Sequence, residues 1–415
     1  MTERKQEDAM AAKSELTFID SDGHVLEHPT GMLDYASAEY RDRIWHIETD
    51  ADGTEWLLWD GVRSPANSAS VSGTAGMSEE DCARAMRGEL RYTEVRPAAY
   101  NAKARLEDLA ADDIAMSVLY PTQLLGIQGS DDVGFANAQC RAYNDWLADH
   151  VSEGEGKLFG AALLPQQDIE LAAAELRRAA TLPGMVAAFI RPNPTADWKP
   201  FHHSVYDPLW KAACDTGLPL GLHPFLDARL PGACLGMHFG HVHETTTSGF
   251  MRQAQEGGPD VGIDNIYFSQ ALSNPFDMMA SMAFLISGGV CERFPELRLV
   301  FLEANGGWLV PWLERLDHHA HVPLFKPDVP LLKMDPSEYF RRQCWISFDA
   351  DESTLAFTAR SPLVGADRIV WASDYPHPDA KFPGTTDELY ETIEDLSDEE
   401  QRLIAGENSV ALYNL

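Results

Sequence analysis

The chain has 415 residues, of which 45% are hydrophobic and 23% charged, a composition typical of a globular protein with a large core. Its 32 Lys and Arg residues stand against 65 Asp and Glu, and the resulting formal charge of −33 argues against nucleic acid and anionic membranes as partners. Six scattered cysteines without a CxxC pair, no signal-peptide pattern and no membrane-length apolar run predict a cytoplasmic protein with free thiols.

Residues 1–15 are polar and are expected to form a disordered tail, followed by one domain over residues 16–415. Eight short apolar or β-branched runs follow, most of them separated by stretches with helical spacing of apolar residues. The predicted strands are Leu16–Asp20, Met116–Tyr120, Lys157–Leu164, Met185–Ile190, Pro219–His223, Leu297–Glu303, Cys344–Asp349 and Arg368–Asp374. The clearest predicted helices are Phe135–His150, Asp168–Ala180, Phe276–Cys291 and Asp387–Ala405. Eight alternating units predict an α/β fold, a closed (β/α)8 or TIM barrel.

Two segments exceed what a minimal barrel needs. Residues 28–110 are rich in turn sequences and are interpreted as an insertion after strand 1. Residues 224–275 form a long loop after strand 5 and are expected to act as a lid or pocket loop. Within this loop, Asn265–Gln270 is an alternative ninth strand. The same loop carries three histidines, His238, His241 and His243.

Side chains able to bind a divalent metal follow several of these strands. The first strand runs into Asp22 and His24, the fifth ends at His223 and the eighth ends at Asp374. Active sites of such barrels lie at the C-terminal ends of the strands, and residues two apart in extended backbone point the same way. Taken singly, each of these residues is more often structural, but together they predict a metal site. Two imidazoles and two carboxylates favour Zn, Mn or Fe, as one ion or two, over Mg or Ca.

At these residues the chain resembles the amidohydrolase superfamily, and within it the amidohydrolase-related branch of aminocarboxymuconate-semialdehyde and resorcylate-type decarboxylases. The resemblance runs from about Phe18 to the C-terminus. It is carried by Ile19–His24, Gly221–Pro224, Gly288–Pro295, Gly307–Arg315 and Ser373–Pro378. It implies that a divalent metal ion is held by four ligands, Asp22, His24, His223 and Asp374. Related barrels commonly self-associate, so the resemblance also implies a homodimer.

The sixth strand departs from the family pattern, because many family decarboxylases carry a histidine there that acts as an acid or contacts substrate. Counting forward from Leu297 places Glu303 at that position, and counting back from Pro311 places Asn305 there. Glu303 is interpreted as a general acid or base, since burial can raise the pKa of a carboxyl group. A metal-ligand role and a purely structural role for Glu303 remain alternatives. His377 is the second residue predicted to move protons.

Three further residues are predicted to contact substrate. Arg191 follows the fourth strand and is a candidate for bidentate binding of a substrate carboxylate, although pairing with a structural acid is equally consistent. Asn305 and His241 are the other two candidates.

Three functions remain open from the sequence. The first is metal-assisted decarboxylation or hydrolysis of a small carboxylate or carbonyl substrate. The second is a dinuclear non-haem iron oxygenase that hydroxylates a small molecule, suggested by the extra carboxylates Glu27 and Glu303 and by the histidines of the long loop. The third is a non-catalytic partner subunit with the same fold, against which the retained ligand set argues.

Overall fold

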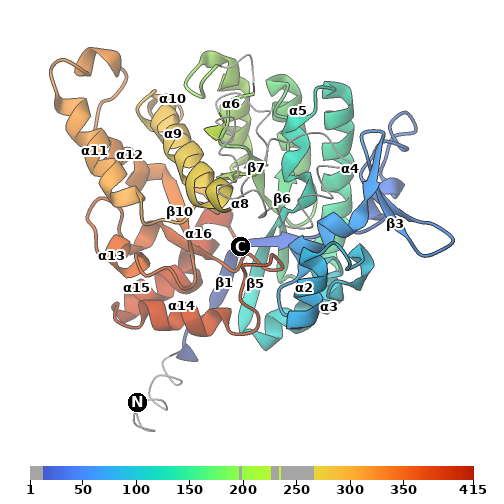
Figure 1. Ribbon diagram of the computed structural model, residues 1–415. Coiled ribbons are helices and arrows are strands. Elements are labelled where there is room, and N and C mark those ends of the chain that lie inside the picture. The colour runs from blue at the N-terminus through green and yellow to red at the C-terminus, as the bar shows by residue number, and fades with distance from the viewer. Residues whose placement is uncertain (1–12, 196–198, 226–232, 235–265) are drawn as a thin grey trace, which may run out of the picture.

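The computed structural model describes residues 13–195, 199–225, 233–234 and 266–415 (Figure 1). Eight parallel strands pair side by side in chain order and form the barrel, surrounded by helices, as predicted. These strands are β1 (Phe18–Val25), β5 (Ile114–Pro121), β6 (Leu158–Leu163), β7 (Met185–Ile190), β8 (Leu220–Leu222), β9 (Leu299–Phe301), β10 (Cys344–Asp349) and β11 (Ile369–Ala372). Each of them overlaps one of the runs expected from the sequence. The core is formed by the buried apolar residues of these strands and of the helices around them.

Helices follow the strands along the chain, and several of them begin at a residue whose side chain caps the first turn. The barrel helices include α3 (Ala102–Ala111), α4 (Val133–Ser152), α5 (Ile169–Ala179), α6 (Asp207–Thr216), α9 (Asn274–Ile286), α11 (Leu309–His321), α12 (Pro336–Gln343) and α14 (Thr385–Ile393). Asp132 and Asp168 cap α4 and α5 by accepting backbone N–H groups of the first turn. No helix in the described part of the chain is long and apolar enough to cross a membrane.

The alternative ninth strand is wrong. Ile266–Phe268 forms the short helix α8, and the backbone continues through a π-helical turn, Ser269–Ser273, into α9. Asn265 itself lies outside the described residues. The physical reason is that this segment continues the helical backbone of α9, and Pro275 lies just after the π-helical turn that joins them.

The segment after β1 adds a small antiparallel sheet to the barrel. Its strands are β2 (His46–Thr49), β3 (Glu55–Trp59) and β4 (Val62–Pro65), followed by the helix α2 (Glu79–Met86). The Asp60–Gly61 turn between β3 and β4 has positive φ at both residues, the conformation that a tight hairpin requires. Helix α3 connects to β5, as the barrel helix between β1 and β5 should. The added sheet and helix α2 therefore come before it in the chain.

The predicted N-terminal tail and the long loop after β8 are only partly within the described residues. Lys13, inside the range expected to be a tail, forms ion pairs with Asp387 (2.6 Å) and Asp113 (3.6 Å). Residues 1–12 lie outside the described residues. So does most of the long loop after β8, including His238, His241 and His243.

A buried carboxylate ties the first and last strands together. Asp20 on β1 accepts hydrogen bonds from the hydroxyls of Ser117 (2.6 Å) and Ser373 (2.8 Å) and from the backbone N–H of Ser373 (3.0 Å). Ser117 belongs to β5, and Ser373 follows β11. The barrel therefore closes around one carboxylate that contacts three strand segments.

We predict that Asp20→Ala lowers the free energy of unfolding by about 2–4 kcal/mol, because it leaves several buried donors without an acceptor. Urea denaturation would measure this loss. Asp34→Ala is the matched control, since its side chain is 89% exposed and its 3.9 Å ion pair is at the surface. Equal denaturation midpoints for the two variants would contradict the prediction.

Candidate active site

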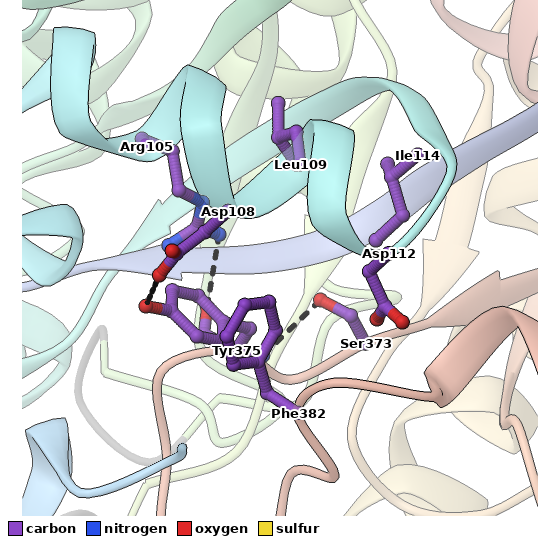
Figure 2. A pocket seen from close by; sticks show the side chains of 8 residues that line it. All are labelled: Arg105, Asp108, Leu109, Asp112, Ile114, Ser373, Tyr375 and Phe382. Carbon is purple, nitrogen blue, oxygen red and sulfur yellow. Dashed lines mark hydrogen bonds between the residues drawn. The ribbon is translucent and has the colours of Figure 1, made fainter. Parts of the chain in front are cut away.

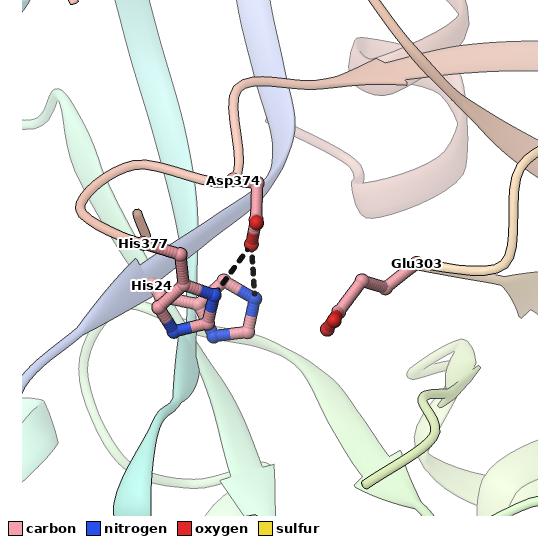
Figure 3. Close-up of side chains that lie close together, drawn as sticks. All are labelled: His24, Glu303, Asp374 and His377. Carbon is pink, nitrogen blue, oxygen red and sulfur yellow. Dashed lines mark ion pairs between the residues drawn. The ribbon is translucent and has the colours of Figure 1, made fainter. Parts of the chain in front are cut away.

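Six ionisable side chains converge at the C-terminal mouth of the barrel. Asp22 and His24 come from the end of β1, and His223 follows β8 directly. Glu303 lies two residues after β9, and Asp374 lies two residues after β11. His377 completes the group, and Figure 3 shows it beside His24, Asp374 and Glu303. The structure thus brings together the four predicted metal ligands and the two predicted proton-transfer residues.

The two imidazoles His24 and His223 face each other through their Nε2 atoms, which are 3.2 Å apart. Each Nδ1 lies within hydrogen-bond distance of a backbone carbonyl, that of Pro121 for His24 (2.9 Å) and that of Pro224 for His223 (2.7 Å). These carbonyls accept from Nδ1–H, so in the neutral rings both Nε2 atoms present lone pairs to each other. A cation between the two rings would be bound by both lone pairs. Ligands about 2.0–2.1 Å from a metal ion are separated by about this distance.

Two carboxylates complete the first group of ligand atoms. Asp22 Oδ1 is 3.9 Å from Nε2 of both histidines, and it is buried with no hydrogen-bond partner among the described residues. Asp374 Oδ1 is 3.4 Å from His24 Nε2. A buried carboxylate oxygen without a donor is costly unless a cation satisfies it. The donor set therefore fits a divalent metal ion.

A second group of possible ligands shares His24 and Asp374 with the four predicted ligands. It consists of His24, Glu303, Asp374 and His377, whose ligand atoms lie within 4.8 Å of one another. Glu303 Oε2 is 2.7 Å from His223 Nε2, and His377 Nδ1 is 2.7 Å from Asp374 Oδ1. Thr122 Oγ1 lies 3.2 Å from His377 Nε2. Both ring nitrogens of His377 therefore lie close to an oxygen atom, Nδ1 to that of Asp374 and Nε2 to that of Thr122.

The backbone at the strand ends is bent to present these side chains. Glu303 has φ 44° and Asp374 has φ 52°, in the left-handed region that residues other than glycine seldom adopt. Such conformations cost about 1–3 kcal/mol and persist where surrounding contacts enforce them, often at functional sites. At Asp374 that contact is a backbone hydrogen bond to Asp22 O (3.2 Å).

Burial and crowding of carboxylates shift the pKa values of the site. Burial raises the pKa of Asp22 well above its ordinary value, and burial together with Glu303 does the same for Asp374. Burial lowers the pKa of His24. Burial also opposes protonation of His223, but the adjacent Glu303 carboxylate outweighs it and raises that pKa, while His223 lowers the pKa of Glu303. Without a cation the site therefore holds extra protons, which a divalent ion would displace.

The predicted substrate-contact residues are not grouped with these six. Asn305 is exposed and donates to Asp349 Oδ2 (2.7 Å), so of the two residues counted for the sixth strand, Glu303 is the one that reaches the site. Arg191 is buried, donates to Asn193 Oδ1 (3.1 Å), and its guanidinium lies 5.9 Å from the Phe225 ring. His241 lies outside the described residues.

Glu27 supports the site without joining it. Its fully buried carboxylate accepts the backbone N–H groups of Thr122 (3.1 Å), Gln123 (3.0 Å) and Leu124 (3.0 Å). Its oxygens are thus already occupied, which weakens its interpretation as an extra metal-binding carboxylate. Its effect is to hold the loop after β5, from which Thr122 contacts His377. The sequence carries no signal for this role, because it depends on the path of that loop.

A separate small pocket lies behind the site, between α3 and the segment after β11 (Figure 2). Its lining residues are Arg105, Asp108, Leu109, Asp112, Ile114, Ser373, Tyr375 and Phe382. None of the six site residues lines it.

Fold and site together define a barrel enzyme with a metal-binding mouth. The chain belongs to the amidohydrolase family, since the family model described as Amidohydrolase matches residues 19–415. This confirms the family expected from the sequence.

Two curated relatives of the chain are named decarboxylases. It is 26% identical over 259 residues to a gamma-resorcylate decarboxylase of Polaromonas sp., covering 60% of this chain and 69% of that protein. It is 23% identical over 329 residues to a 2-amino-3-carboxymuconate-6-semialdehyde decarboxylase of Dictyostelium discoideum, covering 78% and 79%.

Solved structures share the fold. An amidohydrolase of Mycobacterium avium subsp. paratuberculosis superposes with a TM-score of 0.71 at 20% identity, covering 96% of this chain and 99% of that one. A dihydroxybenzoic acid decarboxylase of Polaromonas sp., crystallised with manganese and 2-nitroresorcinol, gives a TM-score of 0.64 at 19% identity, covering 96% and 97%.

Asp349, a buried carboxyl group close to the site, makes the stability of the protein depend on pH. Burial, with Glu352 and Glu303 nearby, raises the pKa of Asp349 from 3.8 to about 7. The folded metal-free protein keeps this proton while the unfolded chain releases it, so this contribution to stability is complete below about pH 4 and falls as the pH rises to about 7. We predict that Asp349→Asn reduces the fall in unfolding free energy over this range. An unchanged slope relative to the exposed control Asp328→Asn would contradict it.

Proposed function

We propose that the protein catalyses the metal-dependent decarboxylation of a small aromatic carboxylate. In this proposal one divalent ion is held by Asp22, His24, His223 and Asp374. The observation that carries it is the pair of opposed imidazole Nε2 atoms beside the buried, unpartnered oxygen of Asp22. The reaction type is supported by the relatives, which are named decarboxylases, and the metal by the manganese of a structural neighbour.

When bound, the ion would supply a positive charge that binds and polarises oxygen atoms of the substrate. The chain itself must then provide a proton, because the bond to the carboxyl carbon breaks, CO2 leaves and the ring carbon takes up H⁺. Glu303 is the proposed donor. It lies 2.7 Å from His223 Nε2, and once that nitrogen is a metal ligand it no longer carries the proton that lowers the pKa of Glu303. Burial raises the pKa of Glu303 and so favours the protonated acid, whereas His377 and a bound ion would oppose it.

His377 is proposed to orient the site and to exchange protons with solvent. Its Nδ1 is 2.7 Å from Asp374 Oδ1 and its Nε2 is 3.2 Å from Thr122 Oγ1, so polar neighbours on both sides restrain the orientation of the ring. Arg191, Asn305 and His241 remain proposed substrate contacts. Arg191 supports this best, since it is a buried cation near the Phe225 ring, and Phe225 lies two residues from His223.

A dinuclear oxygenase is the second candidate function. The specific observation in its favour is the second ligand group, with His24, Glu303, Asp374 and His377. In that case Glu303 would be a ligand rather than an acid. Hydrolysis of a C–C or C–N bond is a further alternative at the same mononuclear site.

Metal stoichiometry and product analysis test these candidates together. Metal-replete protein should contain one divalent ion per chain and release CO2 from at least one member of a panel of hydroxybenzoates and other small aromatic acids. Two irons per chain with substrate-dependent O2 uptake would instead support the oxygenase. Absence of bound Zn, Mn or Fe would contradict the metal site itself.

We predict that Glu303→Gln lowers kcat for decarboxylation by about 10²–10⁴-fold, because it removes the proton donor. Its Mn²⁺ affinity should stay within a few-fold of wild type. Glu314→Gln, an exposed change on α11, is the matched control and should leave both values unchanged. Retention of kcat in Glu303→Gln would refute the acid role, and loss of Mn²⁺ binding would identify Glu303 as a ligand.

A homodimer is also proposed, on resemblance to related barrels alone. Light scattering coupled to size-exclusion chromatography measures the mass directly, and a monodisperse 46.0 kDa species at micromolar concentration would contradict the dimer.

A further inference from the structure

One buried guanidinium reaches from α3 to the backbone of both ligand-bearing strand ends. Arg105 is 2% exposed, and its Nη1 donates to the carbonyl of His24 (3.2 Å). Its Nη2 donates to the carbonyl of Tyr375 (3.1 Å). His24 is itself a proposed ligand, and Tyr375 follows the ligand Asp374. A single planar group therefore contacts the end of β1 and the segment after β11.

The surroundings leave this guanidinium little freedom. The guanidinium carbon of Arg105 lies 4.2 Å from the centre of the Tyr375 ring. The Tyr375 hydroxyl donates a hydrogen bond to Asp108, as Figure 2 shows. The Tyr375 carbonyl also accepts the backbone N–H of His24 (2.8 Å). The carbonyl that Arg105 holds is thus the same one that joins the two strand ends.

Gly23, between the ligands Asp22 and His24, lies directly against this arrangement. A Cβ atom at Gly23 would lie 2.4 Å from Asp20 Oδ2, 2.5 Å from Ser117 Oγ and 3.2 Å from Arg105 Nη2. Asp20 and Arg105 therefore close around the backbone that carries the first two ligands. Asp20 and Asp108 place negative charge close to the buried guanidinium of Arg105.

We propose that Arg105 is a positioning residue of the metal centre. By holding the carbonyl oxygens of His24 and Tyr375 in one fork, it fixes the separation of Asp22 and His24 from Asp374. In this proposal Arg105 acts through the backbone and contacts neither the ion nor the substrate. The inference rests on the proposed metal site and adds to it a residue on a helix outside the barrel strands.

A merely structural arginine would affect the stability of the protein but not the affinity of the folded site for a metal ion. The test therefore measures Mn²⁺ affinity by calorimetric titration of metal-free protein with MnCl2, together with thermal unfolding of the same samples. The variants are Arg105→Met, which removes both donors, and Arg105→Lys, whose ammonium is a point charge that cannot serve two carbonyls as a planar fork does.

The matched control is Arg96→Met. Arg96 also contacts this region, with Nη2 2.6 Å from Asp108 Oδ1 and the guanidinium 5.1 Å from the Phe382 ring, but it donates to no ligand-bearing backbone among the bonds of the described residues. Arg105→Met is expected to weaken Mn²⁺ binding about 10–100-fold, as is typical when a group that orients metal ligands is lost. Arg105→Lys should fall between Arg105→Met and wild type. Arg96→Met should bind Mn²⁺ within about threefold of wild type.

The outcomes separate this inference from the proposed function. If wild-type protein binds no divalent metal, the proposed function fails. If wild type binds Mn²⁺ and folded Arg105→Met binds it equally well, only the role of Arg105 is overturned, as it is if Arg96→Met loses as much affinity. Should Arg105→Met not fold, Arg105→Lys decides, because wild-type affinity in that folded variant overturns the role and a loss supports it.

Discussion

The closure of the last strand segment onto the first is the constraint on which the rest of this structure depends. Asp374 N–H donates to Asp22 O, and His24 N–H donates to Tyr375 O, so the bonds that close the barrel run through three of the proposed ligand residues or their neighbours. These bonds join the two ends of the barrel sheet. The proposed ligands of β1 and of the segment after β11 therefore come together only when those two segments meet.

This location explains why so many charged groups are buried there. Asp20 stabilises the closure through hydrogen bonds from Ser117 and Ser373, which a fully buried carboxylate needs. Two residues further on, Asp22 Oδ1 is buried and has no such donor among the described residues. This contrast between two buried aspartates on one strand distinguishes a carboxylate held by protein donors from the one that we propose as a metal ligand.

Much of the fold was predictable, because the alternation of short apolar runs with helical stretches is a local pattern. Met185–Ile190 and Cys344–Asp349 form strands with the predicted bounds. The strand predicted at Asn265–Gln270 was wrong because its apolar residues are too few to distinguish a strand from the start of a helix. From Ile266 on, this segment is helical and continues into α9. The β2–β4 sheet was not predicted as such, since its pairing depends on non-local contacts.

The candidate site was predictable where residue type and strand end coincide, as for Asp22, His24, His223 and Asp374. The choice between Glu303 and Asn305 was not, because it depends on where β9 ends and how the backbone then turns. The positive φ at both residues sends Glu303 toward His223 and Asn305 toward Asp349. The roles of Arg105 and Glu27 could not be predicted from the sequence, since each side chain holds backbone atoms of distant segments and no residue pattern records this.

Glu303, which follows β9, adds a carboxylate to the site and so changes its charge balance. A histidine there would add no negative charge, whereas Glu303 joins Asp22 and Asp374 as a third carboxylate around two imidazole nitrogens. One divalent ion balances two carboxylates, so the third must be protonated, paired with a cationic histidine or bound to a second ion. In the first two cases Glu303 holds or faces a transferable proton, and in the third the site is dinuclear. Whether Glu303 shares a proton or binds a second ion therefore distinguishes the two proposed functions.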